Sequence, residues 1–155
     1  MITLYTDGSS RGNPGPGGYG VVLKYKEHRK EISCGFRKTT NNRMELLAVI
    51  VGLEALKNPQ SNVMVYSDSK YVVDAVEKGW IWGWLKKGFA KKKNPDLWKR
   101  FIAIYKQHNV KFTWVKGHAG IPENERCDQL AVDAAVSGNL PPDLGYEDAI
   151  QTGTI

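Results

Sequence analysis

Four acidic residues occupy positions from which their carboxylates could meet at one edge of a sheet. Asp7 ends the first predicted strand and Asp68 the fourth, while Glu45 and Asp128 fall near the starts of two predicted helices. If the two strands are parallel neighbours, Asp7 and Asp68 emerge at the carboxyl edge, where open α/β sheets bind ligands. Converging carboxylates repel one another unless cations neutralise them, and oxygen clusters suit Mg²⁺ or Mn²⁺. Two such ions, about 4 Å apart, could flank a scissile phosphate.

Each of these acids also has a purely structural interpretation. Asp68 could cap the helix that follows it, and Glu45 could complete a capping box with Asn42. Asp128 could be a favourable charge near a helix start. Taken one residue at a time, these alternatives stay open.

A short segment of the chain is both strongly basic and rich in aromatic residues. Its cations are Lys86, Lys87, Lys91, Lys92, Lys93, Lys99 and Arg100, and its rings are Trp80, Trp82, Trp84, Phe89 and Trp98. A solvated basic face would explain the lysines but not the tryptophans between them. Cations for phosphates and flat rings for bases or sugars are typical of a nucleic-acid surface. An acidic metal site beside such a surface is the expected anatomy of a metal-dependent nuclease.

The glycine-rich stretch TDGSSRGNPGPGGYG, residues 6–20, contains Gly15-x-Gly17-x-x-Gly20. A dinucleotide-binding fingerprint must open a helix, whereas the residues after Gly20 are Val21, Val22 and Leu23, which favour a strand. The pattern therefore predicts no nucleotide-binding fold. We interpret the stretch as a structured loop between hairpin strands, whose backbone can closely approach a ligand.

Hydrophobic periodicity divides the chain into alternating strands and helices. Strands are predicted over 2–7, 19–25, 31–37, 63–66 and 110–115, and helices over about 42–56, 69–78, 95–108 and 124–136. The order βββαβααβα predicts a single α/β domain over residues 1–155, with a five-stranded mixed sheet made of an antiparallel meander and two parallel strands. The tail after about residue 138 is expected to be loosely ordered and poorly packed.

Composition limits the cellular setting. The chain has 155 residues, a formal net charge of +6 and no apolar run approaching the length of a membrane span. Its two cysteines, Cys34 and Cys127, are far apart in the sequence and fit no metal-site spacing. Two free thiols indicate a reducing compartment, so we expect a cytoplasmic protein.

Five blocks of residues, in matching order and spacing, resemble bacterial ribonuclease HI, of the type 1 ribonuclease H family. The blocks are 6–9 (TDGS), 12–18 (GNPGPGG), 39–46 (TTNNRMEL), 67–69 (SDS) and 115–128 (VKGHAGIPENERCD). The resemblance extends from the first strand to the last predicted helix. It implies hydrolysis of the RNA strand of RNA/DNA hybrids by a two-metal-ion mechanism with Mg²⁺ or Mn²⁺, leaving 5′-phosphate and 3′-hydroxyl ends. It also implies a monomer with no small-molecule cofactor.

The resemblance further implies a role for each matching residue. Asp7, Glu45, Asp68 and Asp128 would bind the metals, and His118 would aid proton transfer or product release. The residues implied on the RNA strand are Gly8, Ser9, Ser10, Asn13, Asn41, Asn42 and Lys70. Those implied on the DNA strand are Trp80, Trp84, Lys86 and Lys87, together with a phosphate pocket formed by Lys38, Thr40 and Asn94. Trp98 is expected to pack in the core instead.

The sequence departs from this family at several substrate-facing positions. Ser10 stands where cysteine is common, Lys70 where glutamine is common and Phe89 where tryptophan is common, and the basic protrusion between Phe89 and Asn94 is short. These departures bear on affinity, because none falls on a metal carboxylate. A related DNA nuclease or resolvase, a non-catalytic hybrid-binding module and a basic structural protein are the rival interpretations.

Overall fold

A computed structural model describes residues 1–152 of the chain. Its elements are β1 (Ile2–Ser10), β2 (Gly15–Tyr25), β3 (His28–Thr39), α1 (Asn41–Glu54), β4 (Asn62–Ser67), α2 (Lys70–Glu77), α3 (Trp80–Lys86), α4 (Pro95–Tyr105), β5 (Asn109–Trp114), α5 (Pro122–Val136) and α6 (Leu144–Thr152). The sheet order is β3-β2-β1-β4-β5. The pairs β1–β2 and β2–β3 are antiparallel, whereas β1–β4 and β4–β5 are parallel. The predicted fold class is confirmed.

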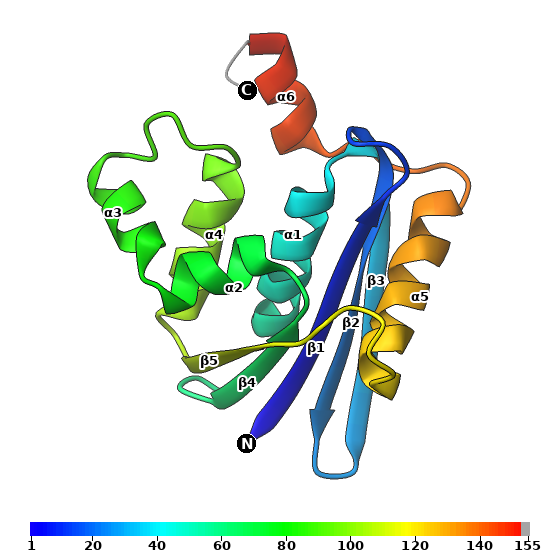
Figure 1. The fold of residues 1–155 in the computed structure, drawn as a ribbon, viewed down its shortest axis with the longest axis vertical. Helices are drawn as coiled ribbons and strands as arrows, with labels where there is room; N and C mark the ends of the chain where they lie inside the picture. The colour runs from blue at the N-terminus through cyan, green and yellow to red at the C-terminus, as the bar shows by residue number, and fades with distance from the viewer. Residues whose placement is uncertain (153–155) are drawn as a thin grey trace.

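The sheet has helices on both faces (Figure 1), with α5 on one face and α1 on the other, followed outward by α4. Helix α1 is buried nearly all round, as its uninterrupted apolar sequence predicts. On the other face α5 packs very close to β2. A Cβ at Gly20 would overlap the carbonyl oxygen of Cys127 on α5, so only glycine allows this approach.

This packing changes the interpretation of the glycine-rich stretch. Strand β2 begins at Gly15 rather than at the predicted Tyr19, so residues 15–18 are strand and the connection is only residues 11–14. Strand β1 likewise continues past Asp7 to Ser10, paired with β2, while its parallel pairing with β4 ends at Tyr5 opposite Tyr66. Gly18 and Gly20 face α5 rather than form an open loop, and that contact between distant segments is not encoded in local periodicity.

Two helices and two caps differ from the predictions. The tryptophan-rich segment forms α3, and the tail contains α6 with Asp143 and Tyr146 buried, so the expectation of poor packing after residue 138 is wrong for these residues. Residues 153–155 lie outside the described part of the chain. The N-cap of α1 is Thr40, whose hydroxyl accepts from the Arg43 N–H, and the N-cap of α2 is Ser69. Neither Glu45 nor Asp68 therefore serves the capping role considered for it.

No helix among residues 1–152 is both long enough and apolar enough to cross a membrane.

Candidate active site

Three of the four predicted metal ligands lie together at the edge of the sheet. Carboxylate oxygens of Asp7, Glu45 and Asp68 all lie within 4.8 Å of one another. Asp7 and Asp68 each follow the last parallel pair of β1 and β4, Tyr5 and Tyr66, by two residues. The parallel pairing therefore brings their side chains to the same edge, as predicted from the sequence.

Glu45 reaches this cluster because α1 lies directly against β1. A Cβ at Gly8 would overlap the backbone nitrogen of Glu45 and the carbonyl carbon of Met44. The Gly8 N–H donates to Glu45 Oε1 and also to Asp7 Oδ1, the latter at 2.9 Å. One backbone amide thus orients two carboxylates, and glycine is needed immediately after Asp7 because any Cβ there would overlap the backbone of α1.

Burial makes this cluster electrostatically unfavourable without cations. Glu45 is 4% exposed, and burial raises the pKa of its carboxyl, as do the neighbouring acids. Burial also raises the pKa of Asp7 to about 6, with the charges of Asp68 and Asp128 adding to the effect. Charged forms are disfavoured because water is excluded and like charges repel. A set of carboxylate oxygens alone, held this closely, fits hard divalent cations such as Mg²⁺.

Asp128 and His118 lie next to this cluster but are not among its three members. Asp128 is half-buried on α5, close enough for its charge to raise the pKa of Asp7. It lines a hollow of about 450 Å³ together with His118, which is exposed and has a left-handed backbone (φ 57°). The loop carrying His118 passes Asp68, because a Cβ at Gly117 would lie 3.0 Å from Asp68 Oδ2.

The predicted RNA-strand residues surround the cluster. Gly8, Ser9 and Ser10 lie on β1, and the exposed Asn41 and Asn42 begin α1. The Asn41 N–H donates to Asn13 Oδ1 at 3.1 Å, which links the β1–β2 connection to α1.

The position of Lys70 reveals a residue that the sequence reasoning missed. Lys70 Nζ lies 4.6 Å from the centre of the Trp114 ring, and Trp114 Nε1 donates to the Asp68 carbonyl at 3.0 Å. Trp114 is 43% exposed beside the carboxylates, so it offers a flat surface there. Its exposure at the end of β5 depends on tertiary packing, which the sequence pattern does not reveal.

The predicted DNA-strand residues of α3 form a separate surface. Trp80 is 49% exposed, Trp84 is half-buried, and both line a hollow of about 670 Å³ with Lys87. Lys86 is exposed at the end of α3. Phe89 is buried, so it contributes to the core and not to this surface.

The residues of the predicted phosphate pocket come from three elements. Lys38 is exposed near the end of β3, Thr40 caps α1, and Asn94 precedes α4 with a left-handed backbone. Trp98 is fully buried, as expected, and its Nε1 donates to the Tyr71 hydroxyl at 2.9 Å.

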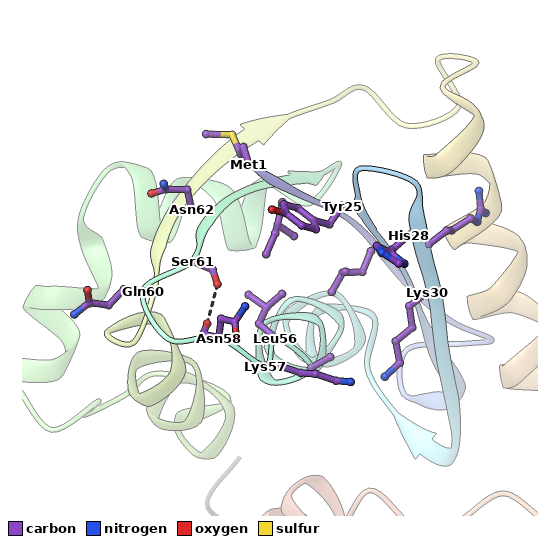
Figure 2. Close-up of a pocket in the computed structure, with 14 residues that line it drawn as sticks. Met1, Tyr25, His28, Lys30, Leu56, Lys57, Asn58, Gln60, Ser61 and Asn62 are labelled. Atoms are coloured by element: carbon purple, nitrogen blue, oxygen red, sulfur yellow. Dashed lines mark hydrogen bonds between the residues drawn. The ribbon is translucent and has the colours of Figure 1, made fainter.

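A further hollow of about 580 Å³ lies away from the carboxylates, at the opposite end of β1 (Figure 2). It is lined by the chain start, the β2–β3 turn and the segment after α1, where Ser61 Oγ donates to the Asn58 carbonyl. The size of a hollow therefore does not identify the site, whereas the carboxylate cluster does.

A mixed sheet with clustered carboxylates at its edge and a basic aromatic surface nearby defines the class of metal-dependent nucleases. Comparison with known proteins narrows this class. The ribonuclease H family model matches residues 1–136. A ribonuclease H of Desulforamulus reducens is 64% identical over 148 residues, covering 92% of each chain. One of Trichodesmium erythraeum is 54% identical over 151 residues, covering 94% of this chain and 96% of the relative.

Solved structures agree with these relatives. A crystal structure of LC9 ribonuclease H1, a type 1 enzyme with the type 2 active-site motif, superposes with a TM-score of 0.79 at 33% identity, covering 99% of this chain and 82% of that one. LC11 ribonuclease H1, crystallised in complex with an RNA/DNA hybrid, gives a TM-score of 0.65 at 29% identity, covering 87% of this chain and 96% of that one. The chain belongs to the ribonuclease H family, among its bacterial type 1 members, and is a metal-dependent ribonuclease.

Proposed function

We propose that this chain hydrolyses the RNA strand of RNA/DNA hybrids with two divalent cations, Mg²⁺ or Mn²⁺, held by Asp7, Glu45, Asp68 and Asp128. The observation that carries the proposal is the cluster of Asp7, Glu45 and Asp68, whose oxygens lie within 4.8 Å of one another. Bound cations would neutralise these acids, favour ionisation of the attacking water and stabilise charge on the phosphate. The work of the protein is to hold the acids in place, which Gly8 and the parallel β1–β4 pair do.

The same proposal places the two strands of the substrate. The RNA strand lies over the end of β1 and the start of α1, where Gly8, Asn13 and Asn41 can contact the 2′-hydroxyls in its minor groove. The DNA strand lies over α3 and the pocket formed by Lys38, Thr40 and Asn94. Support comes from the exposed ring of Trp80 and the exposed lysines of α3.

We also propose that the enzyme acts as a cytoplasmic monomer. A single chain supplies all four carboxylates, and both cysteines are unpaired thiols, Cys34 half-buried and Cys127 buried. Sedimentation of the chain with a bound hybrid measures whether it acts as a monomer.

Metal-dependent cleavage tests the function. We expect rapid cutting of the RNA strand of a labelled hybrid with Mg²⁺, no cutting with EDTA, and little cutting of duplex DNA or double-stranded RNA. Gel analysis of the three substrates measures this. Preferential cutting of duplex DNA would favour a resolvase-like nuclease, and binding without cutting would favour a hybrid-binding module.

The lysines of α3 should contribute to the salt dependence of binding. Each phosphate contact releases counterions, so replacing Lys86 and Lys87 with alanine should reduce the slope of log affinity against log salt by about 1 to 2. Fluorescence anisotropy across a salt series measures this slope. The matched control replaces Lys26, in the β2–β3 turn, and Lys30, near the start of β3, with the same change in net charge. Equal slopes for both double variants would argue against the α3 surface.

His118 should act in the chemical step. Replacing it with alanine should lower kcat by about 10- to 100-fold and leave KM nearly unchanged, because a positioned proton carrier acts in the transition state. Steady-state rates at pH 7.5 measure both constants. His108→Ala is the control. The His108 ring accepts a hydrogen bond from the Ser61 N–H, which joins the segment before β4 to the segment before β5. A rise in KM alone would assign His118 to binding instead.

A further inference from the structure

A buried arginine joins the C-terminal segment to the two helices beside the predicted phosphate pocket. Arg43 is 2% exposed on α1. Its Nε donates to Asp143 Oδ2 at 2.8 Å and its Nη2 to Asp143 Oδ1 at 3.0 Å, while Nη1 and Nη2 donate to the Asp96 carboxylate at 2.9 and 2.8 Å. One cation therefore connects α1, α4 and the residue that precedes α6.

The same arginine contacts two of the three residues of the predicted pocket. Its Nη1 donates to Asn94 Oδ1 at 3.3 Å, and its backbone N–H donates to the Thr40 hydroxyl at 3.2 Å. Asp143 extends the network to β3, because it accepts from the buried Thr39 hydroxyl at 2.7 Å, next to Lys38. Lys38, Thr40 and Asn94 come from separate elements, and these bonds hold those elements together.

The chemistry of these bonds also sets which atoms face a ligand. A guanidinium can only donate, so Asn94 must turn its Oδ1 toward Arg43. Its Nδ2 then donates to the Tyr71 hydroxyl at 3.0 Å with one hydrogen, and the other can serve an anion. The Thr40 hydroxyl accepts from the Arg43 backbone N–H, a helix-capping bond that does not involve the guanidinium, so its hydrogen can donate outward whichever side chain stands at position 43. Without Arg43, Asn94 could flip and present an oxygen to the phosphate, which would be repulsive.

We propose that Arg43 and Asp143 are positioning residues, which orient Asn94, beside Thr40, as a donor to one phosphate of the DNA strand. The inference rests on the proposed function, which places that strand over the pocket. Arg43 is not itself the phosphate ligand, because two carboxylates surround it and occupy its donors. Asp143 lies beyond residues 1–136, the part of the chain that the family model matches, so the C-terminal segment contributes to substrate binding.

The test uses the full chain and a short hybrid in which a block of ribonucleotides within a 2′-O-methyl strand fixes the cleavage register. Neutral methylphosphonates replace the phosphates of the DNA strand one position at a time. Wild type should lose about 10-fold in kcat/KM when the phosphate at one position is neutral, because one charged hydrogen-bonded contact is lost.

Arg43→Lys keeps the buried charge but cannot bond Asp143, Asp96 and Asn94 together. It should raise KM about 5- to 10-fold on the charged hybrid and reduce the methylphosphonate effect, because Asn94 loses its fixed orientation while Thr40 keeps its own.

Asp143→Asn is the second variant, acting from the C-terminal segment, and should reduce the methylphosphonate effect in the same direction. Arg100→Lys is the matched control. Arg100 forms a bidentate pair with Glu54 on α1, but that pair is exposed and, within residues 1–152, makes no hydrogen bond to Lys38, Thr40 or Asn94. The control should keep the full methylphosphonate effect. Thermal melting of every variant accompanies the kinetics.

The outcomes separate this inference from the proposed function. If wild type shows the position-specific loss and both Arg43→Lys and Asp143→Asn retain it, the network only stabilises the fold and the inference is wrong. If wild type cuts hybrids but shows no such loss at any position, the phosphate pocket is wrong and the inference falls with it. Failure to cut hybrids at all would instead overturn the proposed function. A reduced effect in both variants, with kcat within about twofold of wild type, supports the positioning role.

Discussion

Replacing Asp7 with asparagine should abolish cleavage of the hybrid, with kcat falling at least about 10³-fold. Asparagine keeps the shape of the side chain and can still accept from the Gly8 N–H, but it removes a charged ligand from the centre of the cluster. Single-turnover cleavage with saturating Mg²⁺ measures the loss. Asp74→Asn is the control, because Asp74 is an acid on α2 whose partner is Lys78 in an exposed pair. It should cut at the wild-type rate, and an Asp7→Asn enzyme of undiminished rate would refute the metal assignment.

Although Asp7→Asn should lower activity, it should raise the stability of the metal-free protein. Measuring both therefore shows whether activity is lost with the metal ligand or with the fold. Burial raises the pKa of Asp7 above its ordinary value, to about 6. A raised carboxyl pKa means that the ionised form destabilises the folded state at pH 7. This cost begins to fall as the pH drops below about 6, and it is gone only below the ordinary pKa of an aspartate, about 4. Without metal, Asp7→Asn should therefore raise the free energy of unfolding by about 1–2 kcal/mol. With Mg²⁺, wild type should gain more stability than the variant, because ions that bind only the folded state stabilise it.

The sequence predicted the centre of the site because it depends on local rules. Strands with short apolar runs ending in an acid, such as the segment ending at Asp68, are recognisable from periodicity, and parallel neighbours must bring their carboxyl ends together. The meeting of Asp7 and Asp68 follows from those two facts once the strands are paired, whereas Glu45 joins them because α1 packs against β1 at Gly8. The alternative role of Glu45 in a capping box is settled only by the structure, where Thr40 is the cap.

The features that the sequence did not predict depend on contacts between distant segments. Helix α6 has only a weak pattern of its own, and Asp143 is buried because Arg43, on α1, pairs with it. Gly18 and Gly20, in β2, resemble loop residues in sequence, but they pair with β1 and lie against α5. Trp114 is exposed beside the active site although its residue type favours the core. In each case the deciding partner is far away in the chain, so local propensity cannot reveal it.

Gly8 links the fold to the chemistry, and replacing it with alanine should damage both. A methyl group there would overlap backbone atoms of Met44 and Glu45, which cannot move aside as a flexible side chain could. We expect the free energy of unfolding to fall by about 3 kcal/mol, because the contact is overpacked. The start of α1 should shift away from β1 and carry Glu45 with it, lowering kcat by about 100-fold in the molecules that remain folded.

Denaturant unfolding and kinetics at a temperature where the variant is folded measure the two effects separately. Gly83→Ala is the matched control, because Gly83 lies within α3 and a Cβ there would have nothing within 4 Å. The control should be as stable as wild type or more stable by about 0.5–1 kcal/mol, since alanine favours a helix over glycine. If Gly8→Ala lowers stability but leaves kcat intact, Glu45 does not depend on the close contact between β1 and α1. A loss of both, with Gly83→Ala unaffected, would show that the packing of one glycine holds the third carboxylate within reach of the other two.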